Sequence, residues 1–215
     1  DLKKAKEQEQ GFIEIKKGNY VDYRKQMISE NLTGLEDMTI GVVGLGSIGL
    51  AVATAFHRMG SSIVYYDPAL KNATDADQIS ALSLPLEDVL KLSDVVTLHV
   101  PLIPETEGLI GDPELSTMKP GATLIHASRG GVVDEMALAQ HLISGHIGGA
   151  AVDVYSSEPP EADNPLFSLK GDAAQRIIFT PHIAGVTRQA WAKLFQIAWD
   201  NVERVLTGND PINRV

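Results

Sequence analysis

One stretch, residues 39–67, restricts the possible fold more than any other part of the chain. A short apolar run ends at the turn Gly44-Leu45-Gly46-Ser47-Ile48-Gly49; apolar residues then recur at helical spacing, and a second β-rich run ends at Asp67. In a dinucleotide site, the first glycine allows the tight turn, the second admits a pyrophosphate, and the third lets the helix pack on the strand. The helix N-terminus adds N–H donors and positive potential. The stretch therefore predicts a β-α-β unit that binds a dinucleotide.

Asp67 stands at the end of the second strand, about 20 residues beyond the glycine turn, where a carboxylate can accept hydrogen bonds from the adenosine ribose. A 2′-phosphate would meet a negative charge there, and Pro68 and Ala69 supply no arginine to neutralise it. These residues favour NAD over NADP. The alternative is an aspartate that only caps a turn or is solvated.

Composition excludes several other classes of protein. The 215 residues suffice for one sizeable α/β domain or one and a half ordinary ones. A formal net charge of -10 opposes binding to nucleic acid or an anionic membrane, because phosphates require a basic surface. The chain has no cysteine, no set of His, Asp and Glu at metal-ligand spacing, no signal peptide and no apolar run approaching about 18 residues. We therefore expect a cytoplasmic protein without a metal site.

Strand patterns alternate with helix patterns along the chain, which predicts an α/β fold with a Rossmann-type, doubly wound parallel sheet. Residues 68–83 show little periodicity and are interpreted as a surface connection. We divide the chain into a helical lead-in (residues 1–33), an NAD-binding domain (34–186) and a C-terminal helix and tail (187–215). The C-terminal helix is predicted to bury one apolar stripe, formed by Trp191, Leu194, Phe195, Ala198, Trp199, Val202 and Val205.

Ligands of such sheets bind beyond the carboxyl ends of the strands, where several polar residues of this chain fall. Arg129 follows an apolar strand among small residues, and its planar fork of donors suits a carboxylate; the alternative is a surface arginine paired with Asp134. His182 follows another strand. A histidine that exchanges a proton with a substrate needs an acceptor to orient its ring, and Glu158 is a candidate, although both residues could simply be solvated.

Five motifs then occur in a characteristic order. They are Gly44 to Gly49, residues 93–101 (SDVVTLHVP), residues 127–135 (ASRGGVVDE), residues 153–155 (DVY) with Glu158-Pro159, and residues 180–185 (TPHIAG). Together they closely resemble the NAD-dependent D-isomer-specific 2-hydroxyacid dehydrogenases, the family of D-3-phosphoglycerate, glycerate and D-lactate dehydrogenases. The resemblance covers about residues 35–215.

The resemblance implies an oxidoreductase that reduces 2-oxo acids to D-2-hydroxy acids with NAD(H), and that forms a homodimer through the cofactor domain. It assigns Arg129 to the substrate carboxylate, His182 to general acid–base catalysis, and Glu158 to a hydrogen bond with that histidine. Asp153 matches an aspartate near the nicotinamide carboxamide. The predicted cofactor contacts are Gly44, Gly46, Ser47, Ile48, Gly49, Asp67, Val100, Pro101, Thr106, Ala127, Ser128, Arg129, Asp153, His182 and Gly185.

The chain departs from the family pattern in two respects. We expect the N-terminal substrate domain of the family, which holds most of the residues that select the 2-hydroxy acid, to be largely absent from this chain. Because the family packs its C-terminal helix against that domain, the alternative for the apolar stripe of residues 191–205 is that it lies partly uncovered. His126 stands where the family more often has asparagine. Two alternatives remain open: an NAD(H)-binding regulatory module similar to the C-terminal binding protein corepressors, which retain Arg, Glu and His, and a cofactor domain that is inactive without its partner domain.

Overall fold

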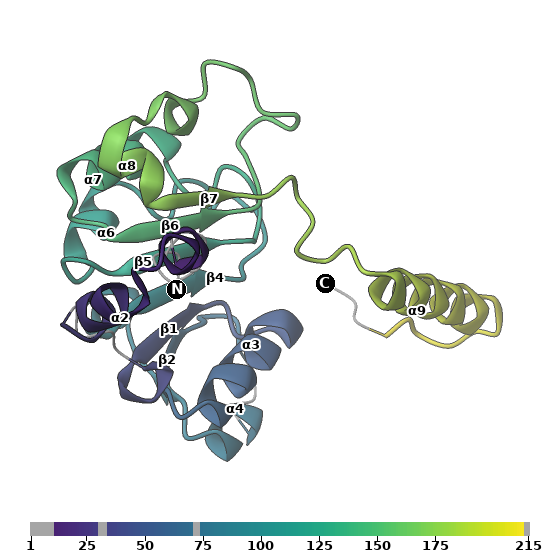
Figure 1. Ribbon diagram of the computed structural model, residues 1–215. Helices are drawn as coiled ribbons and strands as arrows, with labels where there is room; N and C mark the ends of the chain where they lie inside the picture. The colour runs from purple at the N-terminus through teal and green to yellow at the C-terminus, as the bar shows by residue number, and fades with distance from the viewer. Residues whose placement is uncertain (1–10, 30–33, 71–73, 213–215) are drawn as a thin grey trace. The chain divides into compact units, whose positions relative to one another are not determined.

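The computed structural model describes residues 11–29, 34–70 and 74–212 (Figure 1). The chain divides into two compact units, Asp1–Phe179 and Thr180–Val215, and each is described by itself. In the lead-in, residues 11–16 and α2 (Tyr20–Ser29) are helical. The sequence predicts a loop at residues 31–35, of which residues 31–33 lie outside the described residues. The predicted domain boundaries stay predictions.

The described part of the first unit contains one sheet of seven parallel strands in the order β3-β2-β1-β4-β5-β6-β7. The strands are β1 (Thr39–Val43), β2 (Ser62–Tyr66), β3 (Leu82–Ser83), β4 (Val95–Leu98), β5 (Thr123–His126), β6 (Gly149–Val152) and β7 (Ile177–Phe179). The chain builds outward from β1 to β3 and then returns to place β4 on the other side of β1. In parallel sheets, this reversal opens a crevice at the carboxyl ends of the two strands.

Beyond the lead-in, the described helices of the first unit lie along the sheet (Figure 1). They are α3 (Ser47–Arg58), α4 (Thr74–Gln78), α5 (Leu86–Leu92), α6 (Asp112–Thr117), α7 (Glu135–Ser144) and α8 (Gly171–Gln175), with the 3₁₀ turns η1 (Leu35–Asp37) and η2 (Pro165–Ser168). In the sequence, Asp134 as a cap and Gly145 as a stop predict a helix that runs to Ser144, and α7 confirms both ends. The Asp134 carboxylate accepts the N–H groups of Met136 and Ala137, and Gly145 ends the helix in the left-handed conformation.

The side chains of β1 divide between two apolar cores. Ile40 and Val42 pack in the core that contains Ala53 of α3, whereas Val43 packs in the core that contains Leu90 of α5. Because successive side chains of a strand point to opposite faces, helices cover both faces of the sheet at β1. The predicted doubly wound α/β fold is confirmed.

The interpretation of residues 68–83 as a surface connection was wrong. This segment contains α4 and also β3, whose Leu82 and Ser83 pair with Val64 and Tyr65 of β2. A two-residue edge strand is too short to show a period, so only its pairing with β2 reveals it.

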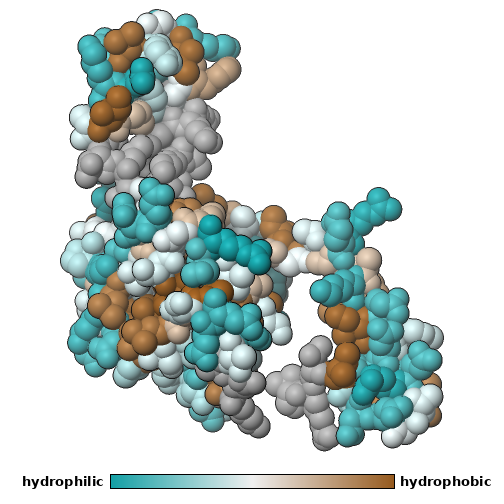
Figure 2. Space-filling model, turned by 90° about the horizontal axis from the view of Figure 1, so that it is seen from below, coloured by the Kyte–Doolittle hydropathy of each residue, from teal (hydrophilic) through white to brown (hydrophobic). Residues whose placement is uncertain are grey.

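In the second unit, α9 (Arg188–Leu206) begins after Thr187, whose hydroxyl accepts the N–H of Ala190 at 3.0 Å. The predicted burial of its apolar stripe was wrong, because α9 buries none of its residues, and Trp199 is 68% exposed. Figure 2 shows apolar side chains gathered along this helix. Helical spacing predicts that a face is apolar but not what covers it. None of the described helices combines the length and the apolar character that a membrane span needs.

Candidate active site

The glycine turn after β1 is built by backbone geometry. Gly44 adopts a φ of +90°, which favours glycine, and its N–H donates to the Tyr66 carbonyl oxygen at 2.8 Å. A Cβ on Gly49 would collide with the Gly44 carbonyl oxygen, whereas a Cβ on Gly46 would meet nothing within 4 Å. Gly49 therefore lets α3 pack closely on the turn, and Gly46 leaves the backbone open to a ligand.

The N-terminus of α3 is suited to an anion. The helix runs for 12 residues, Gly46 supplies no side-chain cap, and its first turn contains no acidic residue. The first N–H groups and the positive end of the helix dipole are therefore available to a phosphate. A pyrophosphate fits this turn, and its contacts with Ser47 and Ile48 stay predictions.

We expect Gly49→Ala to lower the free energy of unfolding by about 1–3 kcal/mol or more, because the new methyl group collides with a backbone carbonyl that cannot move aside easily. Gly46→Ala, in open space, should leave stability nearly unchanged but weaken binding of NADH. Chemical denaturation and NADH fluorescence titration measure the two effects. Equal stability of Gly49→Ala and the wild type would contradict the packing role of Gly49.

Asp67 connects the end of β2 to the glycine turn. Its Oδ2 accepts the Leu45 N–H at 2.7 Å, and its Oδ1 accepts the Ala69 N–H at 2.9 Å. Asp67 therefore does cap the turn at Ala69, as the alternative predicted, but its carboxylate is also held beside the glycine turn and is not simply solvated. Each carboxylate oxygen can accept a second hydrogen bond, so this arrangement leaves capacity for ribose hydroxyls.

The loop after β4 carries three of the predicted cofactor contacts, Val100, Pro101 and Thr106. The Thr106 hydroxyl donates to the Pro101 carbonyl oxygen at 2.6 Å and accepts the Ile103 N–H at 3.0 Å. These hydrogen bonds join residues within the same loop, from Pro101 to Thr106. The segment is therefore held in a defined conformation at the same edge of the sheet as the glycine turn.

Arg129 follows β5 and is exposed, with its Nη1 donating to the Ser128 carbonyl oxygen at 2.7 Å. Within the described residues no ion pair joins it to Asp134, whose carboxylate caps α7 instead. The predicted alternative, a surface pair of these two residues, is therefore not found. The guanidinium retains donors that can bind a carboxylate.

His126 occupies a buried position one residue before the segment Ala127 to Arg129. Its Nδ1 lies 3.3 Å from the Ser128 hydroxyl, and its carbonyl oxygen accepts the Asp153 N–H at 2.9 Å. Burial lowers the pKa of His126 to about 4, so its ring is neutral at pH 7. The buried, neutral ring is therefore typical of a structural histidine. At the neighbouring strand end, burial also lowers the pKa of His99.

The loop after β6 gathers carboxylates around Tyr155. Glu158 accepts the Tyr155 N–H at 3.1 Å through its Oε1. Burial raises the pKa of Tyr155, and the negative charges of Asp153, Glu135 and Glu158 raise it further. A Cβ on Gly130 would collide with the Tyr155 carbonyl oxygen, so the loops after β5 and β6 pack directly against each other.

His182 lies in the second unit, in the loop before α9. Its φ of +53° is in the left-handed region, which costs a non-glycine residue about 1–2 kcal/mol, and such conformations cluster at functional sites. Gly185 is in the same loop, where its carbonyl oxygen accepts the Thr187 N–H at 3.2 Å. Since the two units are described separately, the predicted hydrogen bond between His182 and Glu158 stays a prediction.

The parallel sheet brings the other predicted residues to a single edge. The glycine turn, Asp67, Pro101, Arg129 and Asp153 each follow the carboxyl end of a strand in the same sheet. The part of the chain that the structure describes shows no group of three or more His, Asp or Glu side chains that could hold a metal ion. The groups at this edge of the sheet can bind a ligand through hydrogen bonds and ion pairs.

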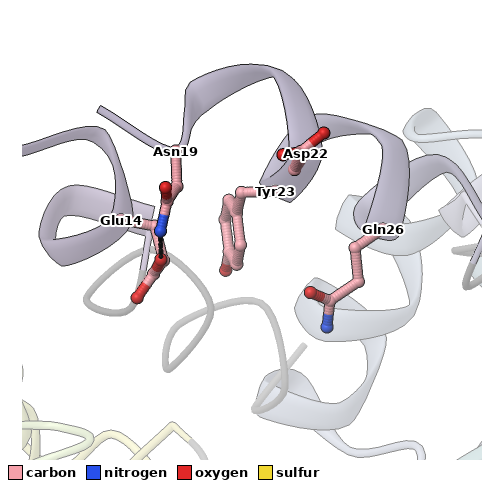
Figure 3. Close-up of a pocket in the computed structure, with 5 residues that line it drawn as sticks. All are labelled: Glu14, Asn19, Asp22, Tyr23 and Gln26. Carbon is pink, nitrogen blue, oxygen red and sulfur yellow. Dashed lines mark hydrogen bonds between the residues drawn. The ribbon is translucent and has the colours of Figure 1, made fainter. Parts of the chain in front are cut away.

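A pocket also lies in the N-terminal segment (Figure 3). Its lining includes Glu14, Asn19, Asp22, Tyr23 and Gln26, and Asn19 donates to the Glu14 carboxylate at 2.8 Å. The lining is polar and carries acidic side chains. None of these residues belongs to the predicted site.

Sequence reasoning missed one contact that bears on the site. Glu135 accepts hydrogen bonds from Ser156, two residues before Glu158, and from Asn164, which follows Glu158 later in the same loop. The motif around residues 127–135 includes Glu135, but no sequence signal pointed to Asn164 as its partner.

The chain matches the family model described as "D-isomer specific 2-hydroxyacid dehydrogenase, NAD binding domain" over residues 2–184. It is 37% identical to D-3-phosphoglycerate dehydrogenase of Archaeoglobus fulgidus over 90% of this chain and 35% of that protein. It is 38% identical to (S)-sulfolactate dehydrogenase of Chromohalobacter salexigens over 91% of this chain and 64% of that protein.

Among solved structures, the apo form of Rhodotorula graminis D-mandelate dehydrogenase superimposes with a TM-score of 0.81 at 26% identity. The superposition covers 97% of this chain and 59% of that chain. The chain therefore spans between about a third and two thirds of the length of these relatives.

Proposed function

Because the chain belongs to the D-isomer specific 2-hydroxyacid dehydrogenase family and carries its NAD-binding domain, we propose that it binds NAD(H) and serves the reduction of a 2-oxo acid to a D-2-hydroxy acid. The observation that carries this proposal is the sheet edge at which the open glycine turn, the Asp67 carboxylate and the Arg129 guanidinium all follow parallel strands. Bound NAD(H) would supply or accept the hydride at C2 of the substrate.

The residues present fit the cofactor. The uncapped N-terminus of α3 and the open side of Gly46 would receive the pyrophosphate, and Asp67 would accept hydrogen bonds from the adenosine ribose. Asp153 and the backbone around Ser128 lie at the strand ends beyond the glycine turn, where the nicotinamide half would extend. The negative charge of Asp67 favours NAD over NADP.

We expect Asp67→Ala to weaken NADH binding about tenfold or more, since it removes hydrogen bonds to a charged acceptor, and to reduce discrimination against NADPH. Parallel fluorescence titrations with NADH and NADPH measure both effects. Asp67→Asn is the matched variant, because its amide oxygen can still accept the Leu45 N–H while the charge is gone. An unchanged ratio of NADH to NADPH affinity in both variants would remove Asp67 from cofactor selection.

The chain's own side chains would bind and orient the substrate and move its proton. Arg129 would bind the substrate carboxylate with paired N–H donors and stabilise the charge that develops on the carbonyl oxygen. His182 would donate a proton to that oxygen during reduction and take it back during oxidation. Glu158 would accept a hydrogen bond from the other ring nitrogen, orienting the ring and stabilising its protonated form.

The proposal is tested by following NADH oxidation at saturating cofactor with a panel of 2-oxo acids: pyruvate, hydroxypyruvate, phosphohydroxypyruvate, glyoxylate and branched-chain oxo acids. Fluorescence titration of NADH runs in parallel, on this chain and on the longest product that its gene encodes. Turnover of one acid establishes the class and names the substrate. Binding of NADH without turnover in both proteins would favour a regulatory NAD(H)-binding module, and absence of binding would overturn the proposal.

Two further expectations rest on the family alone. We propose a homodimer formed through the cofactor domain, which sedimentation velocity tests. The cytoplasmic location stays a prediction.

A further inference from the structure

The loop that carries Glu158 is held on both sides by one carboxylate. The Glu135 Oε1 accepts the backbone N–H of Ser156 at 2.9 Å, and its Oε2 accepts the Asn164 Nδ2 at 2.9 Å. Ser156 precedes Glu158 and Asn164 follows it, so the two oxygens of a single side chain fix the loop before and after this residue.

Asn164 and Glu135, which hold the loop together, are each fixed by further contacts. Asn164 is 9% exposed, and its Oδ1 accepts the Leu166 N–H at 3.0 Å at the start of η2. Because the amide oxygen of Asn164 faces the Leu166 N–H, the NH₂ group of the same amide faces Glu135. Glu135 opens α7, whose Leu138 is buried in the core. The carboxylate therefore connects the loop to a packed helix.

The contacts continue to both residues proposed to act on the substrate. Glu158 accepts the N–H of Tyr155, the residue directly before Ser156, so Glu135 and Glu158 bind adjacent backbone N–H groups. The Tyr155 carbonyl lies against Gly130, the residue after Arg129. Movement of the backbone at Tyr155 and Ser156 would therefore displace Glu158 and disturb the loop that carries Arg129.

We propose that Glu135 is a positioning residue of the dehydrogenase, which holds the loop so that Glu158 is placed to accept a hydrogen bond from the catalytic histidine. This inference rests on the proposed function. Glu135 touches neither substrate nor cofactor in this proposal and acts only through Glu158. A merely structural Glu135 would affect stability without a specific effect on catalysis.

The pair of Glu135 and Asn164 offers an exchange that separates the two roles. Glu135→Gln places an amide NH₂ opposite the amide NH₂ of Asn164, and Asn164→Asp places two carboxylates opposite each other. In the double variant E135Q/N164D, the new amide can donate to the new carboxylate, whose other oxygen still accepts the Leu166 N–H. The double variant restores the hydrogen bonds and the net charge with the partners exchanged.

Two readouts are measured on the three variants and the wild type. Residue-resolved amide hydrogen exchange follows two hydrogen bonds directly. The Tyr155 amide reports its bond to Glu158, and the Ser156 amide reports its bond to Glu135. We expect exchange about tenfold faster in each single variant, with recovery in the double variant. In the active enzyme, kcat for the 2-oxo acid should fall about tenfold in the single variants and recover in the double, while the Kd for NADH stays constant.

The control is Glu161→Gln, the same change of Glu to Gln, placed in the loop that carries Glu158 at an exposed side chain that makes no hydrogen bond within the described residues. It should leave both readouts unchanged. Unchanged exchange at Tyr155 in Glu135→Gln, unchanged kcat, or failure of the double variant to recover would each overturn the proposal. If the wild type reduces no 2-oxo acid, the proposed function fails, and the exchange at Tyr155 alone then decides whether Glu135 positions Glu158.

Discussion

Replacement of His182 by alanine should lower kcat for reduction of the 2-oxo acid by about 10²–10⁴-fold, the usual contribution of a positioned general acid. The imidazole is proposed to give its proton to the carbonyl oxygen, and alanine can supply none. NADH affinity should fall far less than kcat, because the histidine acts mainly in the transition state, even if it also contacts the cofactor. Steady-state kinetics and fluorescence titration of NADH measure the two quantities.

His57→Ala is the matched control, since His57 is exposed on α3 and has no proposed part in the reaction. This variant should turn over like the wild type. If His182→Ala kept full activity, the histidine would not be the general acid. If the variant lost NADH binding together with activity, His182 would instead serve the conformation of its loop, where its left-handed backbone already distinguishes it.

Replacement of Arg129 by lysine should lower kcat/KM for the 2-oxo acid about 100-fold, corresponding to about 3 kcal/mol for the loss of a paired, charge-assisted hydrogen bond. Lysine keeps the positive charge but presents a single ammonium rather than a planar fork of donors. The exposed position of Arg129 indicates that the fold should tolerate the change. Thermal unfolding should therefore resemble that of the wild type.

The control for this variant is Arg58→Lys, the same change at an exposed residue in the last turn of α3, far along the helix from the glycine turn. It should leave kcat/KM unchanged. A loss confined to NADH affinity in Arg129→Lys would assign the arginine to the cofactor alone. Equal kcat/KM in Arg129→Lys and the wild type would show that only its charge is needed.

Predictions from the sequence succeeded where the signal is local. The glycine turn, the helix that follows it, the Asp134 cap and the Gly145 end of α7 all depend on residues within a few positions of one another, and the structure confirms each element. The order of strands and helices also predicted the doubly wound sheet. A parallel sheet carries the carboxyl ends of its strands to one edge, so the approximate place of the candidate site followed from the strand assignments.

Predictions failed or were missing where a feature depends on distant contacts. The strand β3 exists because Leu82 and Ser83 pair with β2, and its two residues have no recognisable period. The spacing of apolar residues in α9 correctly indicated an amphipathic helix, but the burial of that face depends on a partner surface that periodicity does not specify.

The arrangement of the candidate site shows the same division. The resemblance to the family assigned Arg129 and Glu158 to the site, and their roles stay predictions. The contact of Glu135 with Asn164 joins residues 29 positions apart, and it forms only when β5, α7 and the loop after β6 pack together. Backbone conformation and capping are set by near neighbours in the chain, whereas hydrogen bonds between loops require the sheet to bring their strands side by side.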